Sequence, residues 1–183
     1  MTQAIADRTF RDVTDLKDAQ ARFGARMVAL GQANDLLTGE RWVGASLKGA
    51  VEQAVTPHRP EERRCLIEGD EDIQLSPKTA LALTLAMHEM ATNAAKYGAW
   101  SNGEGKVQVS WRSYEGEGGE KRVRIVWEEI GGPPVVAPLK RGFGSVLIER
   151  GLSREMGGEA KLEFLPQGLV CTIDAPETPY AER

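Results

Sequence analysis

The sequence has few of the residues that zinc sites and disulfide frameworks require. Its 183 residues include two cysteines and two histidines. Cys65 and Cys171 lie far apart, with no C-x-x-C spacing and no histidine beside either of them. We therefore expect neither a zinc site nor a disulfide framework, and we expect a protein that folds in a reducing compartment.

Long apolar runs and an excess of basic residues are missing too. The longest apolar run, near residues 80–87, is too short to span a bilayer, and residues 1–10 lack the positive-then-apolar pattern of a signal peptide. The net charge of −4 argues against general nucleic-acid binding, which normally requires a basic stripe. These absences predict a soluble, cytoplasmic chain of one domain plus an appendage, with no nucleic-acid partner and no membrane segment.

A long helix is predicted between Ser76 and Gly98. Ser76 can cap the first turn with its hydroxyl, and Pro77 suits the first helical position, where its missing N–H costs nothing. Gly98 can end the helix. The residues between them are apolar nearly all round, which is typical of a helix packed against a sheet.

Three polar side chains share one face of this predicted helix. Glu89, Asn93 and Lys96 are spaced i, i+4 and i+7. A carboxylate can accept a proton, an amide oxygen suits Mg²⁺, and a lysine is a point charge for a phosphate. The alternative, from these residues alone, is an ordinary solvated stripe on an amphipathic helix.

The N-terminal part of the chain is predicted to be helical. Residues 2–37 show helical spacing that fits two helices with a break near residues 11–15. An isolated helical pair cannot bury its own apolar stripe, so this pair should pack on the main domain or on a second chain. We predict a monomer or a weak homodimer through these helices.

Short elements are predicted between the N-terminal helices and the long helix. A short helix is predicted over residues 47–55, with Ser46 as its N-terminal cap. His58 lies between prolines and is interpreted as a surface loop residue. Short strands are predicted at 65–68 and 72–75, with a turn between them.

Downstream of the long helix, two hairpins are predicted. Residues 106–112 and 122–128 alternate like half-buried strands that pair antiparallel, and residues 159–165 and 169–175 have the pattern of a closing hairpin. The regular pattern stops at Glu129, and the glycine- and proline-rich run after it predicts an irregular, mobile loop.

A Gly-x-Gly sequence opens the last predicted helix. Gly142 and Gly144 precede a helical pattern that runs to Met156 and is closed by Gly157. Glycines just before a helix let backbone N–H groups and the positive helix end approach an anion. Taken alone, this sequence is weak evidence, because most glycines before helices bind nothing.

The order of these motifs resembles the ATP-binding domain shared by gyrase B, Hsp90, histidine kinases and MutL. More narrowly, it resembles the HWE histidine kinases, which are named for a histidine in one box and a Trp-x-Glu in the next. Here His88 lies in HEMATNAAKYG, Trp127 and Glu129 lie in WEEIGGPPV, and residues 140–144 match the GFG box. The resemblance extends from about residue 15 to residue 176.

The resemblance implies an α+β fold, a two-layer α/β sandwich of a mixed, mostly antiparallel sheet with helices on one face, plus the N-terminal helical hairpin. It implies partial dimerisation and phosphotransfer helices at 1–38, an ATP-binding catalytic domain at 39–176, and a tail at 177–183. It also implies a protein histidine kinase that uses ATP and Mg²⁺ and passes phosphate to a response regulator.

The resemblance further implies roles for individual residues at the phosphate end of the site. Glu89 is expected to be the catalytic base toward the acceptor, Asn93 to coordinate the Mg²⁺ that bridges the ATP phosphates, and Lys96 to contact phosphate. Gly142 and Gly144 are expected to let the loop and the helix start meet the phosphates.

At the base end of the site, the resemblance implies a second set of roles. Glu129 stands where the wider superfamily has an aspartate that hydrogen-bonds the adenine amino group, and Gly131 should leave room for the base. His88 and Trp127 are family markers that we expect to be structural or to support the residues that touch the nucleotide.

The acceptor histidine of the family has no counterpart here. Neither His58 nor His88 is expected to accept phosphate, so we expect a chain cut just downstream of the acceptor, which binds ATP but cannot phosphorylate itself. Two other functions stay open: a protein serine kinase of the anti-sigma type, and an adaptor that docks a response regulator without catalysis.

Overall fold

A computed structural model describes residues 45–70, 73–135 and 143–177. The predicted N-terminal helical pair lies outside the described residues, and so do residues 136–142, which include the end of the predicted irregular loop and Gly142. Among the described residues, no helix is long and apolar enough to cross a membrane.

The centre of the molecule is a five-stranded sheet with the strand order β2-β4-β5-β7-β6. Strand β2 pairs parallel to β4, and the other neighbours pair antiparallel, which confirms the predicted mixed, mostly antiparallel sheet. The strands span Cys65–Gly69 (β2), Lys106–Glu115 (β4), Lys121–Ile130 (β5), Glu159–Leu165 (β6) and Gly168–Pro176 (β7).

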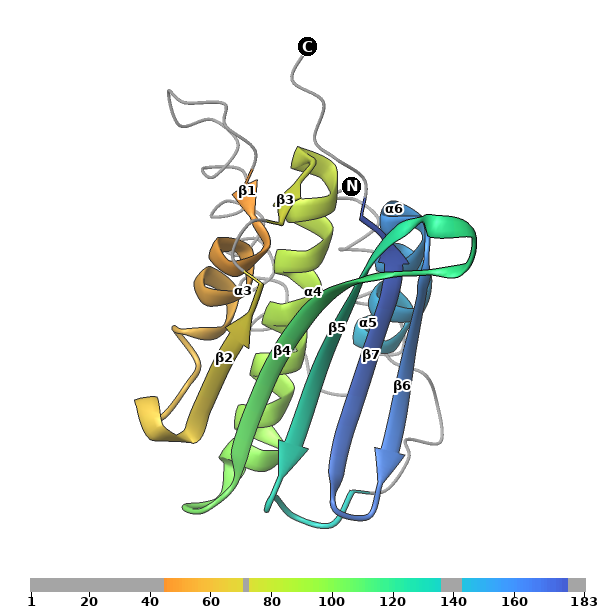
Figure 1. The fold of residues 1–183 in the computed structure, drawn as a ribbon. Coiled ribbons are helices and arrows are strands. Elements are labelled where there is room, and N and C mark those ends of the chain that lie inside the picture. The colour runs from red at the N-terminus through yellow and green to blue at the C-terminus, as the bar shows by residue number, and fades with distance from the viewer. Residues whose placement is uncertain (1–44, 71–72, 136–142, 178–183) are drawn as a thin grey trace.

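Helices cover one face of this sheet, as Figure 1 shows, so the predicted two-layer arrangement is confirmed. The long helix α4 lies behind the centre of the sheet, with α3 beside it. These helices span Leu47–Val55 (α3), Pro77–Lys96 (α4), Phe143–Val146 (α5) and Ser153–Met156 (α6), and a π-helical turn, Leu147–Leu152, joins the last two.

The predicted helix starts are confirmed in atomic detail. The Ser76 hydroxyl accepts a hydrogen bond from the Thr79 N–H at the start of α4, and the Ser46 hydroxyl accepts one from the Gly49 N–H at the start of α3. The last helix ends as predicted at Gly157, whose positive φ of 66° suits a residue without a Cβ.

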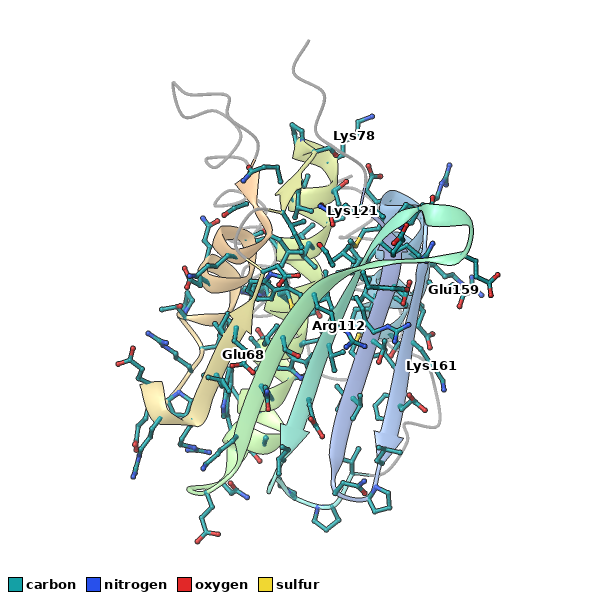
Figure 2. All side chains as sticks on the ribbon, viewed as in Figure 1. Glu68, Lys78, Arg112, Lys121, Glu159 and Lys161 are labelled. Atoms are coloured by element: carbon teal, nitrogen blue, oxygen red, sulfur yellow. The ribbon has the colours of Figure 1, made fainter. Side chains whose placement is uncertain are left out.

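The core lies between the sheet and the helices because alternate strand residues face inward. The inward residues of β4, β5 and β7 are buried together with the apolar residues of α3 and α4; they are Val107, Val109, Trp111, Val123, Ile125, Trp127, Cys171 and Ile173. Figure 2 shows the charged side chains of Glu68, Arg112 and Lys161 on the strands, and all three are exposed.

Two details of the strands differ from the sequence prediction. Residues 74–75 form β3 (Gln74–Leu75), which pairs with β1 (Ala45–Ser46) in a separate two-stranded sheet instead of joining β2. Strand β5 also runs past the predicted end, because Glu129 and Ile130 still pair with β4. Pairing ends before Gly131, whose φ of 72° turns the chain away from strand geometry.

Candidate functional site

The helix face predicted to carry the chemistry meets the start of the last helix. On α4, Glu89 is half-buried and Asn93 is exposed. A Cβ built on Gly144 would lie 3.5 Å from Glu89 Oε2 and 3.6 Å from Asn93 Nδ2, so the backbone of Gly144 sits directly against both side chains. The structure therefore brings Glu89, Asn93 and Gly144 together at one corner.

Lys96 lies further along the same helix. It is exposed in the last turn of α4, where a cation is also favourably placed relative to the helix dipole. The helix ends here because the Asn93 carbonyl accepts hydrogen bonds from both the Tyr97 and the Gly98 N–H. The polar face thus leads from Glu89 to the loop that begins at Gly98.

Glu129 reaches that same loop from strand β5. Its side chain is only 3% exposed, and its Oε2 accepts a hydrogen bond of 2.7 Å from the Ala99 N–H. Burial raises the pKa of this carboxyl above its ordinary value, and the hydrogen bonds from Ala99 and Trp127 only partly oppose the shift. Gly98 has no room for a side chain, because a Cβ there would collide with the Glu129 carboxylate.

One tryptophan bonds the Glu129 carboxylate, and a second packs on the first. The Trp127 indole donates to Glu129 Oε1 at 3.3 Å. Trp127 in turn meets Trp100 edge to face, with ring centroids 6.0 Å apart, and the Trp100 indole donates to the carbonyl of Arg64. The tryptophan of the WEEIGGPPV motif therefore supports the glutamate two residues after it.

Gly131 is exposed just past the end of β5. Its carbonyl accepts a hydrogen bond from the Asn102 side-chain amide, while the Asn102 side-chain oxygen accepts from the N–H groups of Glu104 and Gly105. The turn after β5 and the loop after α4 are consequently tied to each other beside Glu129.

The interpretation of His58 as a surface loop residue needs correction. His58 is half-buried, and its ring meets the ring of His88 edge to face at a centroid distance of 4.6 Å. Burial lowers the pKa of His58. The reason is the close packing of α3 against α4, which brings the loop after α3 onto a residue that is only 8% exposed.

Sequence reasoning missed several residues that shape this site. Arg64, Ala99 and Asn102 carry no motif, and they come from segments read only as a strand start and a helix end. The single available signal was the pair Arg63-Arg64 just before a strand, of which the structure buries only Arg64. Their importance depends on contacts across long stretches of sequence.

The described arrangement has two chemically distinct ends. At one end a carboxylate, an amide and a closely placed backbone surround the corner at Gly144, which suits a metal-bound phosphate group. At the other end a buried carboxylate lies against backbone and indole N–H groups, with acceptor capacity left on its oxygens. One α-helix, α4, connects the two ends.

The sequence of this chain is similar to that of known histidine kinases. The family model described as HWE histidine kinase matches residues 1–71. The Blue-light-activated histidine kinase of Brucella anthropi is 38% identical over 178 residues, an alignment that covers 97% of this chain and 36% of that relative. The chain thus spans little more than a third of the length of this curated relative.

Solved structures show the same fold. The blue-light activated histidine kinase of Erythrobacter litoralis EL346 is similar with a TM-score of 0.63 and 17% identity, covering 96% of this chain and 56% of that chain. The nucleotide-free catalytic domain of histidine kinase ThkA is similar with a TM-score of 0.54 and 18% identity, covering 74% of this chain and 96% of that chain. These structural likenesses show the fold, and the chain is similar in sequence to the HWE histidine kinases over residues 1–71 and to a curated histidine kinase over nearly its whole length.

Proposed function

We propose that this chain is the ATP-binding catalytic part of a two-component sensor histidine kinase. The observation that carries the proposal is the position of the Gly144 backbone against Glu89 and Asn93. A nucleotide triphosphate with its cation needs hard oxygen ligands and closely approaching backbone amides, and this corner supplies both.

The residues at the corner would hold the phosphates and Mg²⁺. Asn93 would coordinate the ion together with phosphate oxygens, Lys96 would pair with phosphate, and the backbone at Gly142 and Gly144 would line the same group. The ion would neutralise phosphate charge. At the base end, Glu129 would accept a hydrogen bond from the adenine amino group, with Gly131 leaving space for the ring.

The reaction would then depend mainly on positioning. Glu89 would orient the imidazole of an acceptor histidine and take up its proton, while a nitrogen–phosphorus bond forms and the bond between the γ-phosphorus and the ADP oxygen breaks. The acceptor would lie outside this chain, whose two histidines, His58 and His88, pack against each other.

A response regulator is the proposed receiver of the phosphate. Histidine kinase ThkA, which has a similar fold, has been solved in complex with the response regulator protein TrrA. Residues 1–38 are proposed to form the partial dimerisation and phosphotransfer helices, residues 39–176 the catalytic domain, and residues 177–183 the tail. A weak homodimer through the N-terminal helices is part of the same proposal.

The test is a calorimetric titration of the purified chain with ATP, with and without Mg²⁺. We expect Mg²⁺-dependent binding that Asn93→Ala weakens at least about tenfold, because the metal loses a ligand. The matched control is Gln108→Ala, which removes an amide from the other face of the sheet, where Gln108 bonds Glu68. Equal binding by Asn93→Ala and the wild type would refute the metal site, and no binding by the wild type would favour a docking module.

A further inference from the structure

Arg64 is a buried arginine that the proposed chemistry does not use. It lies at the end of the 3₁₀ turn η1 (Glu62–Arg64) and is only 6% exposed. All three hydrogen bonds described for its guanidinium go to backbone carbonyls: Nε donates to Gly105 at 2.8 Å, and Nη2 donates to Ala99 at 3.1 Å and to Asn102 at 2.7 Å. A buried charge is costly, so its retention calls for a reason.

The three carbonyls belong to the loop that follows α4. Arg64 is separated from them by 35 to 41 residues of sequence, so its side chain joins the start of β2 to the loop before β4. The planar fork of a guanidinium can satisfy several acceptors in one fixed geometry, which the point charge of a lysine cannot do. Arg64 therefore fixes the position of the loop backbone.

Ala99 connects this arginine to Glu129. The carbonyl of Ala99 accepts from Arg64, while the N–H of the same residue donates to Glu129 Oε2 at 2.7 Å. The Arg64 guanidinium and the Glu129 carboxylate are thus both hydrogen-bonded to the backbone of Ala99. A shift of Ala99 would change the Glu129 hydrogen bond directly.

Other segments also pack closely around Ala99. Gly105 and Gly132 pack against its backbone so closely that a Cβ on either would collide with it. Trp100, the next residue, donates to the Arg64 carbonyl and contacts Trp127, which donates to Glu129. Arg64 and Glu129 are therefore connected in two ways. One connection runs through Trp100 and Trp127, and the other runs through Ala99.

We infer that Arg64 is a positioning residue for base recognition, which holds Ala99 so that the Glu129 carboxylate faces the nucleotide base in one orientation. This inference rests on the proposed role of Glu129 toward the adenine amino group. Arg64 acts through Ala99 and makes no contact with the base itself. It therefore sets which base is preferred and leaves the phosphate end to Glu89 and Asn93.

The experiment compares ATP with inosine triphosphate, whose base carries an oxygen where adenine carries the amino group. Affinities of both, with Mg²⁺, are measured for the wild type, Arg64→Met and Arg64→Lys. We expect the preference for ATP to fall at least about tenfold in Arg64→Met and by a smaller factor in Arg64→Lys. A purely structural role would weaken both nucleotides by the same factor, and that result would overturn the inference.

Matched controls come from the neighbouring arginine. Arg63 is 80% exposed and pairs with Glu61 at the surface, so Arg63→Met and Arg63→Lys should keep the wild-type preference. Thermal unfolding shows whether each variant is folded at the temperature of the titration. If Arg64→Met does not fold, the ratio measured for Arg64→Lys decides the question, and an unchanged ratio in a folded Arg64→Lys would contradict the inference.

One more variant separates this inference from the proposed function. Glu129→Ala removes the acceptor itself. If Glu129→Ala keeps the full preference for ATP, the assignment of Glu129 to the base is wrong. If Glu129→Ala loses the preference while Arg64→Met keeps it, the proposed function stands and only the role of Arg64 is refuted.

Discussion

Glu129 is a carboxylate placed on the helix-facing side of a strand, where apolar residues are the rule. The residue before it, Glu128, points to the other face of the same strand and is half-exposed. Hydrogen bonds from Ala99 and Trp127 satisfy part of the capacity of Glu129, yet burial still raises its pKa. Proteins often keep such a perturbed group where it has a chemical task.

This shifted pKa gives a prediction about stability and pH. The native state holds the Glu129 proton more tightly than the unfolded chain, whose ordinary value is 4.5. The protonated Glu129 carboxyl makes its full contribution to the free energy of unfolding below that pH. This contribution is lost as the pH rises through the raised pKa. We therefore expect the wild type to lose stability relative to Glu129→Gln as the pH rises above the ordinary value of 4.5, measured by urea unfolding.

Glu128→Gln is the matched control for this prediction. It removes a carboxylate from the same strand on the opposite face. An identical drift in both variants, or no drift in Glu129→Gln, would show that burial of Glu129 does not determine the effect.

At the scale of elements, α4 carries the polar face that makes the site. Its buried side packs on the sheet, so the positions of Glu89 and Asn93 follow from the helix as a rigid unit. The helix begins with a hydroxyl cap, in which Ser76 Oγ accepts from the Thr79 N–H at 3.2 Å and also bonds Thr79 Oγ1 at 2.8 Å. The cap is several turns away from the polar face.

Removing this cap should destabilise the fold without changing the site. We expect Ser76→Ala to lower the free energy of unfolding by about 1 kcal/mol, because the first turn loses the partner of one N–H group. ATP affinity should be unchanged. Ser110→Ala, on the half-buried outer side of β4, is the control and should change stability less. A large loss of ATP binding in folded Ser76→Ala would mean that α4 does not act as a rigid support.

At the scale of the whole molecule, the sheet protects both cysteines to different degrees. Cys171 lies in β7, between two neighbouring strands, and is 0% exposed. Cys65 lies in β2, which is paired only on one side, and is 8% exposed. Burial raises the pKa of Cys65 to about 11 and that of Cys171 to about 12, so thiolate is scarce at neutral pH.

Thiol labelling can therefore report how the sheet opens. In the native protein near pH 8 we expect both thiols to react at least about a hundredfold more slowly than in the unfolded chain, with Cys65 ahead of Cys171. The edge strand should detach before the centre of the sheet opens. Cys65→Ser and Cys171→Ser each leave one thiol to follow by absorbance with a disulfide reagent. Faster labelling of Cys171 than of Cys65 would contradict this order.

The sequence by itself determined the elements and the motifs, because these depend on local patterns. The caps at Ser46 and Ser76, the spacing of Glu89 and Asn93 and the glycine that ends the last helix, Gly157, all act within a few residues. They were enough to predict the α+β fold and the family. The N-terminal helices and Gly142 lie outside the described residues, so those expectations stay predictions.

Only the tertiary structure decided how charged and aromatic residues meet. No local pattern distinguishes Arg64 from Arg63, yet one is buried on backbone carbonyls and the other is exposed. Strand β5 extends to Glu129 because β4 offers it partners, and His58 reaches His88 because two helices pack. Burial of a charge depends on which backbone groups other parts of the chain bring to it, and sequence periodicity carries no information about those groups.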